Sequence, residues 1–588
     1  MKKVDVDLVT LTTVWHGLQR VCHEMRHVID RTAGSYLIAQ LHDVSVGVWD
    51  ATGRTVAIPV GLAVQFAGSK FPVQFILEKF KGNIFPGDVF LANDPYHGGF
   101  NCHVPDWCFF RPIFYKDELL FFTLAKAHQM DSGGAFPGGY FPAPYDVHAE
   151  GLCIPPTKVF EKGVEKTDLF ELIWNNVRWP EAVRVDNYAM IAATKICEKR
   201  IVELLDRYGR DTVTACVDAM IQRTERTVRS EISKIPDGTY YGEAATDDDS
   251  AELDVPVWAR CDVTKKGDEL TIDFSKSDSQ RKGFVNNVYA STYSQAVVAS
   301  LLFLDPAIAD FHNEGSMEPI HVVAPEGSVL NCRYPAPVGG SPVSMGIQIM
   351  EAVLMAMSQA LPQRAIASWG HHRGDYVFGT DPRTDERYVR TSFDYDGSGG
   401  ACYGHDGYQG ATALGGLGSI QRGNVEEEEM RIPLRILKYQ FATDLMGAGK
   451  WRGGPGMHWE AINEGSDSGM ATGSSDGETV SAPGALGGQP TPFSSTWIKR
   501  GEEMIFARCH RMHQVKTGDI IVKHSSGGAG VGDPAERDPE KVKEDVINEL
   551  VSLKAARETY KVAIDPVTME INWQETKALR GGVASPGA

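Results

Sequence analysis

An apolar stretch that carries three potential metal ligands constrains this chain more than any other feature. Residues 93–131 read NDPYHGGFNCHVPDWCFFRPIFYKDELLFFTLAKAHQMD, and FFRPIFYKDELLFFTLAKAH within them is typical of two buried strands that turn at KDE. His103, Asp106 and His128 lie among these apolar residues. Buried imidazoles and carboxylates are costly unless they are paired, hydrogen-bonded or bound to a metal. The fold must therefore supply a partner for each of them.

A hairpin of this length would return His128 to a position beside residues 103–106. An H-x-x-D pair followed by a second histidine offers nitrogen and oxygen donors that suit zinc, manganese or iron, and three protein ligands leave a position open for water or substrate. The alternative is a hydrogen-bonded His–Asp pair that stabilises a loop. The spacing alone favours neither interpretation.

Asp43 is a further candidate ligand, because it interrupts the otherwise apolar and small residues of LHDVSVGVWD. An unpaired carboxylate buried in such a strand would be expensive, whereas a metal would neutralise it. The alternative is an acid at the strand edge that faces water.

A glycine- and proline-rich segment, AHQMDSGGAFPGGYFPAPYDVHAEG, follows the second strand and carries Asp131, His148 and Glu150. Beside a metal it would serve as a substrate lid, and otherwise it is a long surface connection. Aromatic residues near the candidate ligands would form either one wall of a pocket or ordinary core: Phe100, Trp107, Phe136, Tyr140 and Phe141.

Length and periodicity predict an α+β chain of several domains, because 588 residues exceed one ordinary core. We expect helices over 7–31 and 69–82, and a strand-like segment over 36–50. The expected parts are a mixed α/β domain that holds the metal site (1–160), a helical segment (161–235), an α+β central domain (236–425), a β-rich domain (426–535) and a helical tail (536–588).

The central domain ends in a glycine-rich stretch, residues 393–424, whose composition cannot form a regular helix or strand. Ordering such a loop is entropically costly, so we expect it to close over the metal site or to meet a partner subunit. His405 and Asp406 would then approach the metal pocket or the subunit interface.

Composition excludes several classes of function. The net charge is −19 and no basic stripe is present, which argues against nucleic acid or an anionic membrane surface as a partner. Ten cysteines are scattered without a CxxC pair, no apolar run approaches 18 residues, and the N-terminus does not resemble a signal peptide, so we expect a cytoplasmic protein. GGAGVGDP (527–534) lacks the lysine of a phosphate loop, and no other nucleotide motif is present.

Several motifs together resemble one family. NDPYHGG, HVPD, AHQMDSGG, EGLCIPP, GAGKWRGGPG and SSGGAGVGDPAERDPEKVKEDV occur in the order found in the B-type subunits of the hydantoinase B/oxoprolinase family. The resemblance implies a divalent-metal site at His103, Asp106 and His128, with Asp43 as an additional ligand. Zinc is the expected metal and manganese the alternative.

The resemblance also implies a division of labour. Relatives work with a separate A-type ATPase subunit that binds ATP and Mg²⁺ and phosphorylates the carbonyl oxygen of the substrate. We therefore expect the metal-bearing subunit of an ATP-dependent hydrolase of cyclic amides, such as lactams, hydantoins or oxoproline, in a hetero-oligomer with that partner. Asp131 or Glu150 would act as general base. The alternatives are a subunit of an ATP-dependent ketone carboxylase that acts on an enol phosphate, and a scaffold without catalytic function.

Overall fold

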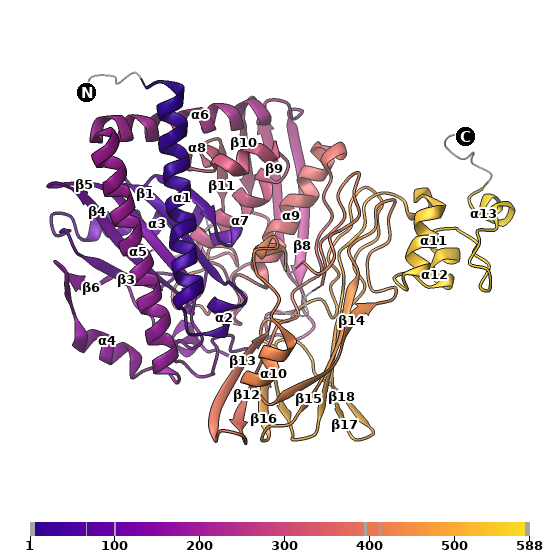
Figure 1. Ribbon diagram of the computed structural model, residues 1–588. Coiled ribbons are helices and arrows are strands. Elements are labelled where there is room, and N and C mark those ends of the chain that lie inside the picture. Colours follow the sequence, from indigo (N-terminus) through magenta and orange to yellow (C-terminus); the bar gives the residue numbers. More distant parts are fainter. Residues whose placement is uncertain (1–5, 66, 99–101, 393–396, 412, 582–588) are drawn as a thin grey trace.

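The computed structural model describes residues 6–65, 67–98, 102–392, 397–411 and 413–581 (Figure 1). It has mixed helices and four sheets, as expected for an α+β chain. Within these residues, no helix combines the length and the hydrophobicity needed to span a bilayer. Phe100, residues 393–396 and residue 412, on which some expectations fall, lie outside the described residues.

The first sheet is built around the predicted hairpin. It has seven strands in the order β2-β1-β5-β4-β3-β6-β7, with bounds Thr55–Val60, Val44–Asp50, Glu118–His128, Asp106–Tyr115, Val89–Ala92, Thr157–Glu161 and Val164–Glu165. Strands β4 and β5 pair in antiparallel register, and both are almost wholly buried. Their apolar runs therefore lie at the centre of the sheet, covered on both faces.

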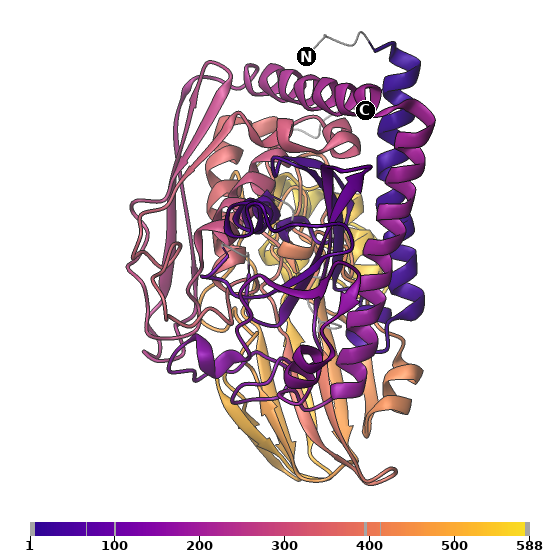
Figure 2. The same ribbon diagram turned by 90° about the vertical axis from the view of Figure 1, so that its left-hand side faces the viewer.

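Two long helices, α1 (Leu8–Thr32) and α5 (Pro180–Tyr208), lie side by side on one face of this sheet (Figure 2). The helix α3 (Lys70–Lys79) packs against the other face through Val73 and Ile76. One apolar core joins α1, the sheet, α5 and the first half of α6 (Arg210–Ile232), up to Ile221. Val228, Ile232 and Ile235 pack instead into the core of the central part. The short helix α4 spans Thr167–Trp174.

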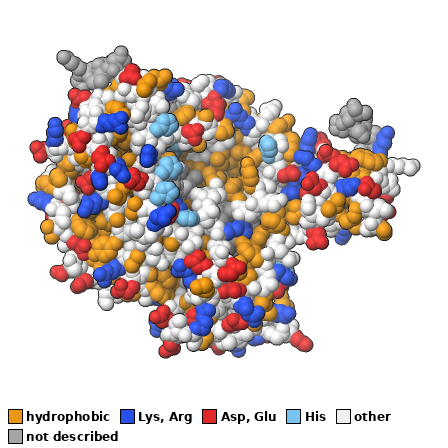
Figure 3. All heavy atoms as spheres, in the orientation of Figure 1, with side chains coloured by type: hydrophobic (Ala, Val, Ile, Leu, Met, Phe, Trp, Pro, Cys, Tyr) orange, Lys and Arg blue, Asp and Glu red, His pale blue; other side chains and the backbone are white. Residues whose placement is uncertain are grey.

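Outward-facing histidines mark the exposed side of α1. In the space-filling view they gather over this helix (Figure 3), where His16, His23 and His27 are exposed. They are separated from the buried face of the helix, which carries Val14, Leu18 and Met25.

The central part of the chain has its own sheet and core. Four strands lie in the order β11-β10-β9-β8, with bounds Ile320–Val323, Glu269–Asp273, Val257–Lys266 and Gly238–Thr246. The buried helices α7 (Tyr289–Leu301) and α9 (Met345–Ala360) pack together, and α9 lies against β8 and β9. The short helix α8 spans Glu314–Met317.

The C-terminal part is a pair of sheets followed by helices. One sheet has the order β13-β12-β16-β19 (Glu386–Ser392, Asp375–Asp381, Ser468–Ala471, Met512–Val515), and the other has β14-β15-β20-β17-β18 (Leu434–Ala442, Gly456–Asn463, Ile520–Ser525, Ser495–Arg500, Glu503–Phe506). Apolar residues of both sheets form one core, so the sheets pack face to face. The remaining helices are α10 (Val425–Arg431), α11 (Pro539–Ile547), α12 (Leu553–Glu558) and α13 (Trp573–Leu579).

Glycine-rich segments pack backbone to backbone beside this pair of sheets. A Cβ atom on Gly400 would lie 2.1 Å from the carbonyl oxygen of Ala367, and one on Gly453 would lie 1.8 Å from that of Gly528. Backbone hydrogen bonds join the segments, including Gly454 N to Gly399 O at 2.9 Å and Gly528 N to Gly454 O at 3.0 Å. We call residues 397–401, 447–456 and 527–531 the glycine layer. Its composition therefore serves close packing, and residues 397–401 do not line the cavity beside the candidate ligands, which corrects the expectation that this part of the loop closes over the site; its contact with a partner subunit stays a prediction.

Most expected elements are present, with one local exception. The helices expected over 7–31 and 69–82 are α1 and α3. The segment expected to be strand-like from residue 36 instead begins with the short helix α2 (Tyr36–Ala39), and β1 starts only at Val44. Leu37 and Ile38 of α2 are buried, so tertiary packing determines the local structure here.

Candidate metal centre

The strand register of the central hairpin brings the three candidate ligands together. Asp106 opens β4, His128 ends β5, and these two residues are direct partners across the strands. His103 lies three residues earlier, in a turn where the backbone nitrogen of Asp106 donates to its carbonyl oxygen at 3.2 Å. The side chains of His103, Asp106 and His128 are at most 3% exposed and offer one ligand atom each within 4.8 Å of one another.

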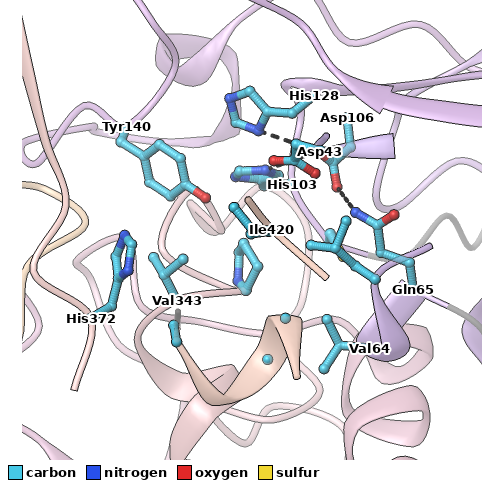
Figure 4. A pocket seen from close by; sticks show the side chains of 16 residues that line it. Asp43, Val64, Gln65, His103, Asp106, His128, Tyr140, Val343, His372 and Ile420 are labelled. Carbon is cyan, nitrogen blue, oxygen red and sulfur yellow. Dashed lines mark hydrogen bonds and ion pairs between the residues drawn. The ribbon is translucent and has the colours of Figure 1, made fainter. Parts of the chain in front are cut away.

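The carboxylate of Asp106 is the centre of this cluster. Its Oδ1 lies 3.3 Å from Nε2 of His103 and 3.3 Å from Nδ1 of His128 (Figure 4). Burial opposes ionisation, but Lys126 and His103 outweigh it and hold the pKa of Asp106 well below its usual range. The site therefore presents an anionic oxygen between two imidazole nitrogens.

Two polar side chains at this centre were not anticipated. Lys126 is fully buried, with Nζ 3.1 Å from Oδ2 of Asp106 and 3.4 Å from the sulfur of Cys102. Gln65 donates from Nε2 to the same Oδ2 at 3.4 Å. A sequence signal existed for Lys126, because residues two apart on a strand point to the same face, and Lys126 precedes His128 by two. Gln65 reaches the site from a separate segment and had no such signal.

A backbone carbonyl fixes the orientation of His103. Nδ1 of His103 lies 2.9 Å from the carbonyl oxygen of Gly339. The carboxylate of Glu150 accepts hydrogen bonds from the backbone nitrogens of Val338 and Gly339, at 3.1 and 2.6 Å. A proton on Nδ1 leaves Nε2 as the ligand atom, the arrangement in which a carbonyl orients a metal-bound histidine. Glu150 therefore supports the turn that orients His103.

Asp43 lies beside the cluster, immediately before β1. Its carbonyl oxygen accepts from the backbone nitrogen of His128 at 3.3 Å, and its side chain is buried. Burial raises its pKa to about 6, a change that His128 partly offsets. Neither Asp43 Oδ1 nor His128 Nε2 has a hydrogen-bond partner among the described residues. Such orphaned atoms beside a set of two nitrogen donors and a carboxylate fit a divalent transition metal.

The cluster opens onto a small cavity of about 40 Å³ (Figure 4). Tyr140 directs its hydroxyl into it, and its ring stacks on His128 at a centroid distance of 5.6 Å. The lining comes from distant parts of the chain: Asp43, Leu62, Val64, Gln65, Cys102, His103, Asp106, His128, Tyr140, Pro342, Val343, His372, Ala413, Gly415, Gly416 and Ile420.

The two carboxylates expected as general bases do not line this cavity. Asp131 accepts from the backbone nitrogen of Arg178 at 2.6 Å and pairs with its Nη1 at 3.0 Å. Glu150 is turned toward the amides of residues 338 and 339. Both are buried and held by hydrogen bonds, so their contacts are those of carboxylates that position the chain.

The aromatic residues near the candidate ligands divide between the two alternatives of pocket wall and ordinary core. Tyr140 lines the cavity, whereas Trp107 lies in the core under α1 and α5, and Phe136 packs on Phe141 and Phe378. Four residues of the glycine-rich loop do line the cavity: Ala413, Gly415, Gly416 and Ile420.

His405 and Asp406 do not reach the cavity, which corrects that expectation. His405 is exposed, and Asp406 forms an ion pair with Arg537 of the C-terminal tail at 2.7 Å. Their contact with a partner subunit stays a prediction.

Comparison with known proteins shows that the chain is similar to a caprolactamase subunit in both sequence and structure. The chain is 32% identical to the beta subunit of caprolactamase from Pseudomonas jessenii, over 95% of this chain and 97% of that one. The crystal structure of ATP-dependent caprolactamase from Pseudomonas jessenii matches with a TM-score of 0.91 and 29% identity, covering 98% of this chain and 100% of that chain.

Two further relatives cover most of the sequence. The B-type chain of a putative D-/L-hydantoinase from Pseudomonas sp. (strain NS671) is 30% identical, over 99% of this chain and 98% of the relative. The delta subunit of acetophenone carboxylase from Aromatoleum aromaticum is 25% identical, over 92% and 84% respectively. The family model described as hydantoinase B/oxoprolinase matches residues 7–534. The chain therefore belongs to the hydantoinase B/oxoprolinase family.

Proposed function

We propose that this chain is the metal-bearing B-type subunit of an ATP-dependent hydrolase of cyclic amides of the lactam, hydantoin or oxoproline type. The observation that carries the proposal is the buried cluster of His103, Asp106 and His128, which opens onto a cavity in a chain similar to the beta subunit of caprolactamase. The chain would complete ring opening after an A-type ATPase subunit has phosphorylated the carbonyl oxygen of the substrate.

This division of labour has a chemical reason. An amide carbonyl is a poor electrophile, but phosphorylation of its oxygen makes the carbon reactive toward water. ATP and Mg²⁺ would bind the partner subunit. The glycine-rich stretch GGAGVGDP is the part of this chain nearest in composition to a phosphate loop. Its residues 527–531 are packed within the glycine layer, where they cannot cradle a phosphate, and this supports ATP binding by the partner.

The residues of the centre have distinct roles in this proposal. His103, Asp106 and His128 would hold a divalent metal with Asp43 as a further ligand, and such a metal supplies activation of a bound water at neutral pH. Zinc suits the two imidazoles and the carboxylate, and manganese is the alternative. The apolar side chains of Val64, Val343 and Ile420 line the cavity and would displace water from around a bound substrate.

A second candidate is a subunit of an ATP-dependent ketone carboxylase that acts on an enol phosphate. The similarity to the delta subunit of acetophenone carboxylase favours it. The caprolactamase subunit is the stronger guide to substrate class, because it is 32% identical to this chain and the acetophenone carboxylase subunit is 25% identical. The alignment with the caprolactamase subunit also covers more of both chains.

The two functions are separated by the products of the purified complex between this chain and its A-type partner. ATP is supplied with lactams, hydantoins or 5-oxoproline, or with aryl ketones and bicarbonate, and phosphate and organic products are followed. We expect a cyclic amide to be opened. Stimulation by ketones alone, with formation of a keto acid, would instead support the carboxylase.

The metal site is tested by His103→Ala. Removal of one ligand should lower zinc affinity and ring opening by about 100-fold or more while assembly with the partner is retained, because the side chain is buried away from the surface. Zinc titration, turnover and gel filtration measure these three properties. Full turnover in this variant contradicts the proposal.

A further inference from the structure

Ring opening needs a group that moves a proton, and the cavity wall limits the choice. The carboxylates of Asp131 and Glu150 lie outside the cavity. The titratable side chains that line it are Asp43, Cys102, His103, Asp106, His128, Tyr140 and His372. His103, Asp106 and His128 form the metal cluster, and Asp43 lies beside it.

Two of the three remaining side chains are poorly suited to proton transfer near neutral pH. Burial raises the pKa of the Cys102 thiol to about 12, and this thiol lies against Lys126. Burial also raises the pKa of Tyr140 well above its usual range, and the ring is packed between His103, His128 and Tyr376. His372 is the remaining titratable side chain on the described cavity wall, and imidazole is the side chain that most readily exchanges protons at physiological pH.

His372 enters the cavity from a different part of the fold. It is 1% exposed and lies across the pocket from the metal cluster, close to Val343 (Figure 4). The segment that carries it immediately precedes β12, in the C-terminal pair of sheets. The imidazole therefore faces the space between the cluster and the opposite wall, where a bound substrate would lie.

The neighbours of His372 hold its backbone in place. Nε2 of His371 lies 3.1 Å from Oε1 of Glu351 on α9, and Arg373 pairs with Glu478. The backbone nitrogen of Asp476 donates to the carbonyl oxygen of His372 at 2.9 Å. Because both adjacent side chains are anchored to other elements, the ring of His372 is set at the cavity rather than on a loose loop.

We propose that His372 is the catalytic proton carrier of the ring-opening reaction, an inference that rests on the function proposed above. Its imidazole accepts a proton from the water whose oxygen bonds to the carbonyl carbon. The imidazole delivers this proton to the ring nitrogen of the cyclic imidate phosphate. The second proton of the same water follows by the same route as the carbon–nitrogen bond breaks, the electron pair of that bond stays on nitrogen, and the water oxygen becomes the carbonyl oxygen of an acyl phosphate. A second water hydrolyses the acyl phosphate to the carboxylate and inorganic phosphate, and the imidazole ends the cycle neutral.

The test uses the complex of the full chain with its A-type partner. His372→Gln and His372→Ala are compared with His16→Gln, a matched change of an exposed histidine on α1. Turnover of the cyclic amide, zinc affinity and thermal unfolding are measured for each. We expect kcat to fall about 100- to 10,000-fold in both His372 variants, the usual contribution of a positioned acid–base group, with zinc affinity unchanged. Added imidazole should restore part of the activity of His372→Ala.

Each other outcome has a definite meaning. A His372→Gln complex as active as wild type overturns the inference while leaving the proposed function intact. Loss of zinc affinity like that of His103→Ala also overturns it, because His372 would then support the metal. Imidazole rescue distinguishes loss of a proton carrier from misfolding, since imidazole cannot refold a chain, and a folded His372→Ala variant without rescue counts against the inference. A wild-type complex that opens no cyclic amide contradicts the proposed function and this inference together.

Discussion

At the scale of single residues, buried carboxylates of the same kind serve different purposes. Asp106 is kept ionised by Lys126 and His103, which suits a metal ligand. Burial raises the pKa of Glu150 to about 8, although the amides of Val338 and Gly339 oppose the change. Glu150 accepts hydrogen bonds from the backbone of residues 338 and 339 and so fixes this turn. The carbonyl oxygen of Gly339 in the same turn orients the ring of His103.

Glu150→Ala tests this positioning role. Loss of the carboxylate frees the amides of residues 338 and 339, so the carbonyl that orients His103 is no longer fixed. We expect zinc affinity to fall about 10- to 100-fold, the usual effect of removing an outer partner of a metal ligand. Asp117→Ala, in the exposed turn between β4 and β5, is the control. Unchanged zinc binding in Glu150→Ala would show that the turn holds without this side chain.

At the scale of elements, the glycine layer explains why so many glycines occur late in the chain. Three separate segments approach so closely that a single methyl group would meet backbone atoms. Backbone cannot move aside as a flexible side chain does, so the requirement for glycine is steric at these positions. The layer also holds residues on either side of the cavity-lining segment, because the backbone nitrogen of Gly410 donates to Oγ of Ser398 at 2.9 Å and Nη2 of Arg422 donates to the carbonyl oxygen of Gly397 at 3.5 Å.

Neighbouring glycines in the layer provide a matched pair of substitutions. A Cβ atom on Gly400 would lie 2.1 Å from the carbonyl oxygen of Ala367, whereas one on Gly399 would have its nearest contact, with the nitrogen of Tyr408, at 3.4 Å. We expect Gly400→Ala to lower the free energy of unfolding by about 2 kcal/mol or more, and Gly399→Ala by less than about 1 kcal/mol. Denaturant titration measures both. Equal stability of the two variants would mean that the layer relaxes around a methyl group.

At the scale of the whole molecule, the cavity lies where three parts of the chain converge. The hairpin of the first sheet and the turn before it supply the three candidate metal ligands, and Pro342, Val343 and His372 supply the opposite wall. Ala413, Gly415, Gly416 and Ile420 complete the lining. Buried polar contacts cross between the parts. Among them, the pair of His371 and Glu351 joins the segment before β12 to helix α9 of the central part.

This pair predicts a loss of stability at alkaline pH. Burial lowers the pKa of His371, but Glu351 outweighs it, and Asp476 and Asp247 also face the ring, so the pKa rises to about 9. The pKa of His371 in the folded state is therefore above its unfolded value of about 6.5. Its contribution to the free energy of unfolding is fully present below pH 6.5 and is lost as the pH rises through 9. The melting temperature should therefore fall between pH 7 and 9, and this fall should be smaller in Glu351→Gln. An identical pH dependence in that variant would show that other groups cause it.

The sequence by itself determined many of the helices and strands and the proximity of the three candidate ligands. Apolar periodicity located α1, α3 and the hairpin of β4 and β5, because burial of one face imposes that spacing. The hairpin also implied that His128 lies close to His103 and Asp106, since two strands joined by a short turn pair with each other. The resemblance, rather than the spacing, raised metal binding above a simple His–Asp pair.

Only the tertiary structure decided which distant residues share the cavity. His372, Gln65 and Ile420 reach it from separate segments, and no sequence period relates them to the hairpin. The tertiary structure also decided the direction of Asp131 and Glu150. Both lie near the candidate ligands in sequence, but Asp131 is turned toward Arg178 and Glu150 toward the amides of residues 338 and 339. Contacts between segments far apart in the chain depend on how whole sheets and helices pack, and side-chain direction at a loop follows from that packing rather than from local composition.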